Sequence, residues 1–188
     1  MRRALLIILA SAFIFSGSSL MAFHLMNSAS DASISGQEAA DSIQVENWGT
    51  DGGGGGTQNI VRKAKEFLTR YARPHSFPYA PGTQNGVLGC ANVVTACLKE
   101  AKEMKDINLG CVPTSDILMQ MGWKKFIPPP IKAGDVVLWQ TYQPRPSHIG
   151  IAVENGGVSA KVMNNSSSQK KPVLSNANSM KLLYVLRK

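Results

Sequence analysis

The sequence predicts an α+β domain in which N-terminal helices pack on an antiparallel β-sheet. From residue 58 to about residue 121, apolar residues recur at the three- and four-residue spacing of amphipathic helices. After residue 134 they fall instead in short runs bounded by turn residues, as in strands. Helices followed by consecutive strands favour an antiparallel sheet, because neighbouring parallel strands need a long crossover between them. A chain of 188 residues has room for one such domain with tails.

The first 26 residues have the composition of an export signal. A basic Met1-Arg2-Arg3 head precedes an apolar stretch that continues to Met26. The cleavage site is not clear, and the stretch from Ala4 to Met26 is long enough to span a bilayer if it is retained. We therefore expect residues 1–26 to be a signal peptide or a signal anchor. The protein is expected to be exported to the periplasm, the cell envelope or the exterior, and to be membrane-anchored if the segment stays.

Residues 27–57 are predicted to be a flexible linker. Ser, Ala and Gly are frequent there, and the run from Gly52 to Gly56 loses much conformational entropy if its backbone is fixed. The linker leads into the folded domain, residues 58–188.

Charge is unevenly divided between the two parts of the chain. Residues 1–56 carry two Arg against five acidic residues, whereas residues 57–188 carry 18 Lys and Arg against seven acidic residues, a net charge of +11. A basic domain is attracted to polyanions such as nucleic acid, anionic lipid or an anionic cell wall. Basic residues do not alternate with aromatic ones in any run, and no nucleic-acid module is recognisable, so we expect no nucleic-acid partner.

Three helices are predicted before the sheet. Apolar spacing indicates a helix over Asn59–Ala72, a second from Cys90 or Ala91 to Lys105, and a short third over Ser115–Met121. The segment from His75 to Gly89 is rich in Pro and Gly, which predicts a loop.

Four strands are predicted after the helices. Their expected ranges are Asp135–Trp139, Ile149–Val153, Gly157–Met163 and Leu182–Leu186. The sequence Asn155-Gly156-Gly157 predicts a tight turn between the second and third strands.

Cys90 is the candidate nucleophile. It follows Gly89 at the predicted start of the second helix, where free N–H groups and the positive end of the helix dipole favour a thiolate over a thiol. The alternative is that Cys90 is a small buried hydrophobic residue, which is common for cysteine.

His148 is the candidate base, because a thiol nucleophile needs a group to take its proton. It is at the start of a predicted strand and shares a face with Gly150 and Ala152, which are small enough to leave room for a covering group or a cleft. A lone histidine at a strand start is more often a surface residue. Its combination with a cysteine at a helix start makes the catalytic interpretation stronger.

Asn165 is the candidate third residue. If Asn155 pairs with Val158, the hairpin places Asn165 directly across from His148, where its carboxamide can orient the imidazole. An even-numbered shift of the register would bring Asn164 there instead. The alternative is that both asparagines belong to a polar turn.

The other cysteines are expected to be structural. Cys97 is two helical turns after Cys90, and Cys111 is in a predicted loop, so the two could form a disulfide in an oxidising compartment and leave Cys90 free. No His and Cys cluster has metal-ligand spacing, so we expect neither a metal nor another cofactor.

Three segments together resemble the cell-wall peptidases and amidases of the NlpC and CHAP type. These are Cys90 at a helix start, Gly134–Trp139, and Ser147–Ile151. The resemblance covers about residues 58–188 and implies a papain-like core with a catalytic cysteine on a helix and a histidine and a third polar residue on adjacent strands. It also implies a cleft-lining role for Tyr79, and we assign Tyr79 and Asn164 as candidate substrate-binding residues.

The sequence departs from the NlpC pattern at the nucleophile and the third residue. Gly89-Cys90-Ala91-Asn92 stands in place of Asp-Cys-Ser-Gly, and asparagine in place of a third-position histidine is closer to the CHAP branch. The resemblance implies a monomeric peptidoglycan hydrolase that cleaves either a stem-peptide amide or the N-acetylmuramoyl-L-alanine bond. Two alternatives are an inactive module that binds peptidoglycan or a partner, and a phage or secreted lysis toxin with the same chemistry.

Overall fold

The computed structural model describes residues 55–127, 130–141 and 145–188. The predicted signal segment, residues 1–26, lies outside the described residues, as does the predicted linker up to residue 54. Within the described ranges, no helix is both long enough and apolar enough to cross a bilayer.

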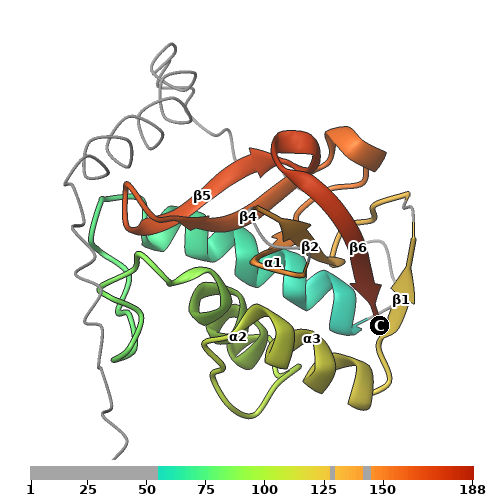
Figure 1. Ribbon diagram of the computed structural model, residues 1–188, viewed down its shortest axis with the longest axis horizontal. Helices are drawn as coiled ribbons and strands as arrows, with labels where there is room; N and C mark the ends of the chain where they lie inside the picture. The colour runs from blue at the N-terminus through green and yellow to red at the C-terminus, as the bar shows by residue number, and fades with distance from the viewer. Residues whose placement is uncertain (1–54, 128–129, 142–144) are drawn as a thin grey trace, which may run out of the picture. The chain divides into compact units, whose positions relative to one another are not determined.

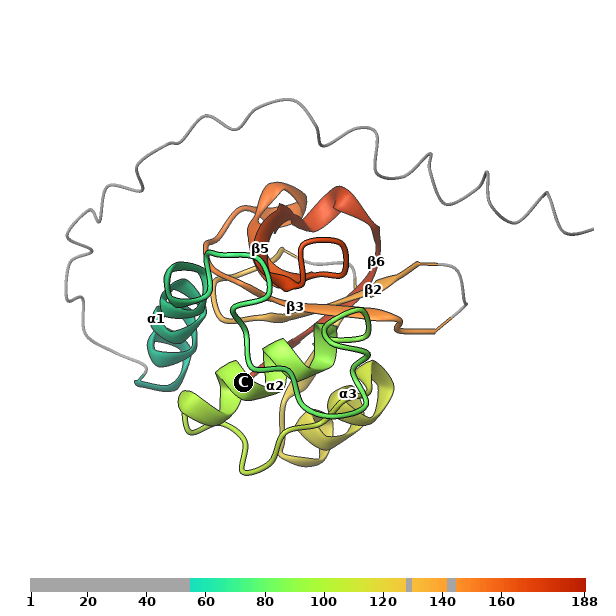
Figure 2. The ribbon, with the colours of Figure 1, turned by 90° about the vertical axis from the view of Figure 1, so that its left-hand side faces the viewer.

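The fold is α+β, as predicted, with three helices packed on a six-stranded antiparallel sheet (Figure 1). The turned view in Figure 2 shows all three helices on the same side of the strands. The helices are α1 (Gly55–Arg70), α2 (Cys90–Glu100) and α3 (Cys111–Gln120). The strands are β1 (Lys124–Phe126), β2 (Val136–Gln140), β3 (His148–Ala152), β4 (Lys161–Ser166), β5 (Lys171–Asn176) and β6 (Lys181–Arg187), in the order β1-β6-β2-β3-β4-β5.

The helix boundaries differ from the predicted ones. Helix α1 begins at Gly55, inside the segment predicted as linker, and ends at Arg70. Helix α2 ends at Glu100 and not at Lys105, because Lys102 adopts a positive φ of 64° that an α-helix does not allow. Helix α3 begins at Cys111 rather than at Ser115, so Cys111 is helical and not in a loop.

Two strands, β1 and β5, were not predicted from the sequence. Strand β1 has three residues, all exposed, and strand β5 alternates irregularly between exposed and covered side chains. Both are edge strands of the sheet. Short, polar edge strands lack the apolar run that identifies a central strand.

The pairing of β3 with β4 corrects the predicted register. Gly150 pairs with Asn164, and Ile151 with Met163, which is one residue away from the predicted pairing of Ile151 with Val162. The connection between the strands contains a 3₁₀ turn at Gly157–Ser159 instead of a two-residue hairpin turn, so β4 begins later than predicted. A shift of one residue moves every β4 side chain to the other face of the sheet.

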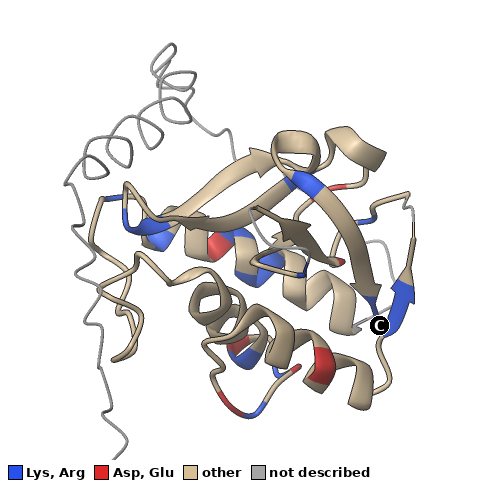
Figure 3. Cartoon of the chain, viewed as in Figure 1, with Lys and Arg blue, Asp and Glu red and all other residues tan. Residues whose placement is uncertain are grey.

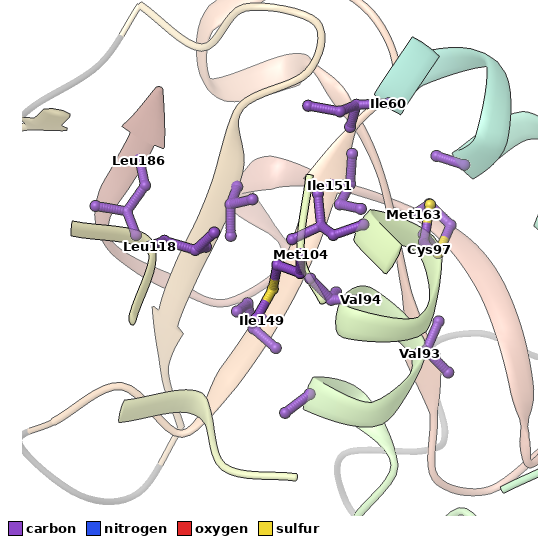
Figure 4. Packing of buried hydrophobic residues seen from close by; sticks show 14 of the residues in the cluster. Ile60, Val93, Val94, Cys97, Met104, Leu118, Ile149, Ile151, Met163 and Leu186 are labelled. Carbon is purple, nitrogen blue, oxygen red and sulfur yellow. The ribbon is translucent and has the colours of Figure 1, made fainter. Parts of the chain in front are cut away.

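Both faces of the sheet are buried. Figure 4 shows apolar side chains of α2 packed against those of β3 and β4 on the helix-covered face, with Val94 and Cys97 facing Ile151 and Met163. On the other face, Trp139 is buried and its Nε1 donates to the Ala177 carbonyl at 2.6 Å. Because β3 is packed on both sides, its first residue is held in a fixed position.

Candidate active site

Cys90 is the first residue of α2 and is half-buried. No side chain caps the helix start, so the N–H groups of the first turn are free to face the thiol. A hydrogen bond from Cys111 lowers the pKa of Cys90, and burial opposes this; hydrogen bonds from His148 and the Ala91 N–H lower it further, to about 4. Cys90 is therefore a thiolate at neutral pH, which is the reactive form.

His148 is the first residue of β3, directly across from Trp139 of β2, and its ring lies 5.5 Å from the indole, centroid to centroid. Its Nε2 is 3.1 Å from Oδ1 of Asn164, an acceptor, so Nε2 carries the proton of that bond. The ring nitrogen Nδ1 is then left to interact with Cys90. Burial opposes protonation of His148, but its bond to Cys90, the thiolate charge and Asn164 together raise its pKa.

Asn164 is buried and holds the imidazole from the neighbouring strand. Its Nδ2 donates to the carbonyl of Val162 at 3.2 Å. This second bond fixes which end of the carboxamide faces His148, because the amide nitrogen is already engaged. Asn164 thus stands next to the histidine where the sequence predicted Asn165.

The prediction for Asn165 as the residue that orients His148 is wrong. The one-residue shift of the register turns Asn165 to the other face of β4, where it is buried. There its Nδ2 donates to the carbonyl of Gly86 at 2.8 Å, and its Oδ1 accepts from the hydroxyl of Tyr79. Asn165 therefore holds the loop that leads into Cys90.

Tyr79 packs within that loop, and two glycines make room for its ring. A Cβ on Gly86 would lie 2.6 Å from Cε2 of Tyr79, and one on Gly89 would overlap the other edge of the ring. Burial raises the pKa of Tyr79 to about 12, so the hydroxyl keeps its proton and donates it to Asn165. The backbone of the residue after Tyr79, Ala80, donates to Asn92 Oδ1 at 2.9 Å, which ties the loop to α2. These contacts show a positioning role for Tyr79, and its contact with substrate stays a prediction.

Cys111 is a site residue that the sequence analysis did not identify. It is buried at the start of α3, and its Sγ lies 3.5 Å from Sγ of Cys90. Its bond to Cys90 and its burial raise the pKa of Cys111, so it remains a thiol that donates to the thiolate. The sequence signal that could have identified Cys111 is the pair Gly110-Cys111, which repeats the pair Gly89-Cys90 at the start of α2.

The structure does not pair Cys97 with Cys111 as the sequence analysis suggested. All three cysteines are free, and Cys111 faces Cys90. Cys97 is fully buried in the core between α2 and the sheet, and burial raises its pKa. Cys97 is therefore an inert apolar side chain.

No group of three His, Cys, Asp or Glu residues in the part of the chain that the structure describes could hold a metal ion. A comparison with models of known protein families finds no match, and a comparison with curated protein sequences finds none either. The geometry of the site and the resemblance of its motifs are therefore the basis for a functional assignment.

Proposed function

We propose that this protein is a cysteine hydrolase of the NlpC and CHAP type that cleaves an amide bond in peptidoglycan. The observation that carries the proposal is that His148 interacts both with Cys90, whose pKa it lowers, and with Asn164, to which its Nε2 is hydrogen-bonded. A cysteine at a helix start, a base beside it and a carboxamide behind the base are the three parts of a thiol hydrolase.

In the proposed reaction the Cys90 thiolate attacks the amide carbonyl carbon. The negative charge that develops on the carbonyl oxygen is stabilised by free N–H groups in the first turn of α2. Protonated His148 gives its proton to the leaving amine, and a thioester to Cys90 remains. His148, now neutral, takes a proton from water, which hydrolyses the thioester and restores the thiolate. Asn164 holds the imidazole in one orientation through both steps.

The charge of the domain supports an anionic polymer as substrate. In the part of the chain that the structure describes, Lys and Arg are spread over several elements, among them α1, β1 and β6 (Figure 3). A net charge of +11 on residues 57–188 attracts the protein to a polyanion, and this attraction weakens as the salt concentration rises. Together with the predicted export signal and the motif resemblance, this favours peptidoglycan over a soluble peptide. The bond is either a stem-peptide amide or the N-acetylmuramoyl-L-alanine amide.

The test is release of soluble fragments from purified sacculi by the full chain. Wild type and Cys97→Ala should release fragments, and Cys90→Ala should release none, since only Cys90 lies beside the base. Mass spectrometry of the fragments would identify the bond. If folded Cys90→Ala releases fragments as fast as wild type, the thiol mechanism is wrong. If folded wild type releases none, the binding module is favoured, unless Cys90 still reacts fast with iodoacetamide; in that case the proposed substrate is wrong.

A further inference from the structure

Two cysteines from different helices meet in the site. Cys90 opens α2 and Cys111 opens α3, and their sulfur atoms are 3.5 Å apart. A disulfide bond is about 2.05 Å long, so the two sulfurs already lie close and must approach further for the bond to form. Among the described residues, Cys90 is the hydrogen-bond partner of the Cys111 side chain.

The two sulfurs are suited to different steps of thiol–disulfide exchange. Cys90 is half-buried, partly open to solvent, and hydrogen-bonded to a histidine, so it can attack a disulfide that arrives from solution. Cys111 is buried beneath it and cannot meet a bulky oxidant first. It lies where it can attack the sulfur of Cys90 once that sulfur is linked to another group. This is the arrangement of an attacking and a resolving cysteine.

We propose that Cys90 and Cys111 form a reversible disulfide that blocks the nucleophile, so that the protein is active only when reduced. The oxidant is a low-molecular-weight disulfide or a protein disulfide of similar reactivity. The effect on catalysis rests on the proposed hydrolase function, whereas the disulfide itself does not.

Two exchange steps make the bond. The Cys90 thiolate attacks one sulfur of the oxidant, the sulfur–sulfur bond of the oxidant breaks, and the first thiolate leaves. Cys111 then attacks Cys90 Sγ, and the second half of the oxidant leaves with the Cys111 proton as a thiol. Two electrons pass from the two cysteines to the oxidant, which is reduced to two thiols. A dithiol reductant reverses the sequence.

The disulfide removes both properties that the hydrolase needs. The Cys90 sulfur in a disulfide carries no negative charge and cannot attack a carbonyl carbon. It also cannot form an ion pair with His148, whose raised pKa depends on the thiolate. Oxidation thus inactivates the proposed nucleophile through the cysteine that is its neighbour in the site.

The experiment uses the full chain and oxidised glutathione, followed by alkylation and peptide mapping. Trypsin places Cys90 and Cys97 on one peptide, residues 71–99, and Cys111 on another, residues 106–124. Cys97→Ala is the matched control, because a link between those peptides in this variant can only join Cys90 to Cys111. Fragmentation of the linked wild-type peptides assigns the same sulfurs without any substitution.

We expect the linked peptides in wild type and in Cys97→Ala, and their separation by dithiothreitol. Cys111→Ser should instead keep glutathione on Cys90 as a mixed disulfide, because no resolving thiol is present. Cys90 should lose its reaction with iodoacetamide on oxidation of wild type and regain it on reduction. Release of fragments from sacculi should follow the same course.

The proposed disulfide is contradicted if oxidised glutathione leaves Cys90 free or stably glutathionylated in wild type, or if the link involves Cys97. The proposed control of activity by the disulfide is contradicted if the linked protein releases sacculus fragments as fast as the reduced protein. If the reduced protein releases no fragments while the link forms, the hydrolase proposal fails and the disulfide stands.

Discussion

The two Gly-Cys helix starts share a local structure and differ in chemistry. Gly89-Cys90 opens α2 and Gly110-Cys111 opens α3, and neither start has a side-chain cap. Yet the pKa of Cys90 is lowered and that of Cys111 is raised. A helix N-terminus alone therefore does not decide which cysteine becomes the nucleophile.

The difference comes from what else surrounds each sulfur. Cys90 has His148 beside it, whereas Cys111 is buried with Cys90 as its hydrogen-bond partner. Two thiolates 3.5 Å apart would repel each other, so only one of them can be charged. The cysteine with the histidine takes the charge, and the other keeps its proton and donates it.

The largest expected effect separates the two cysteines directly. Cys90→Ala should lower the rate of fragment release at least about 10³-fold, because no other group can form the thioester. Cys111→Ala should keep the rate within about 10-fold of wild type, because it removes one hydrogen bond to the thiolate. Kinetics of fragment release from sacculi at neutral pH would measure both. Comparable losses in the two variants would show that Cys111 takes part in the chemistry.

The next effect concerns the base that distinguishes the cysteines. His148→Ala should lower the turnover rate by about 10²–10⁴-fold, because the leaving amine loses its proton donor. It should also raise the pKa of Cys90 toward the ordinary thiol value of about 8.5. The rate of iodoacetamide labelling against pH would measure this, with Cys97 silent as the internal control. An unchanged pH dependence of labelling in His148→Ala would show that His148 does not stabilise the Cys90 thiolate.

The pH dependence of wild type follows from the same pair. The pKa of Cys90 is lowered to about 4, so the thiolate persists as the pH falls from neutral and is lost only near that value. The pKa of His148 is raised, so the proton for the leaving amine is lost above its ordinary value. We expect a bell-shaped profile of turnover with an acid limb near pH 4 and an alkaline limb above about 6.5. An acid limb near the ordinary thiol value would contradict the ion pair.

A smaller effect separates the two neighbouring asparagines. Asn164→Ala should lower kcat by about 10–10²-fold with little change in melting temperature, since a misoriented base slows the reaction. Asn165→Ala should lower the free energy of unfolding by about 1–3 kcal/mol, because the Tyr79 hydroxyl and the Gly86 carbonyl lose their partner. Kinetics and thermal melts of both variants would test this. A loss of kcat in Asn165→Ala together with a loss of stability in Asn164→Ala would support the register predicted from the sequence instead.

The prediction with the smallest expected change in turnover tests the hydrogen bond between the cysteines. Cys111→Ala should raise the pKa of Cys90, because the largest cause that lowers it is lost, and Cys111→Ser should raise it less, because the hydroxyl can still donate. Labelling of Cys90 between about pH 4 and 6 would show the order wild type, Cys111→Ser, Cys111→Ala. Identical curves for the three proteins would mean that Cys111 does not stabilise the thiolate.

The sequence was sufficient for the parts of the site that depend on local pattern. Cys90 and His148 are each at the start of an element, and apolar periodicity locates element starts to within a few residues. The third residue depends on how two strands align, and that alignment was set by a 3₁₀ turn that the glycines at 156 and 157 did not reveal. Cys111 was missed because α3 begins four residues before its apolar pattern does. Long-range contacts of this kind need the tertiary structure.

The turn at Gly157–Ser159 has a consequence for how this domain tolerates changes in length. Because side chains alternate along β4, a one-residue deletion in the connection that shifts the strand would replace Asn164 by Asn165 beside His148. Both positions hold asparagine, so a carboxamide would remain beside His148, although the other β4 side chains would have to repack on the opposite faces of the sheet. With a single asparagine in β4, the same deletion would leave His148 without a carboxamide neighbour.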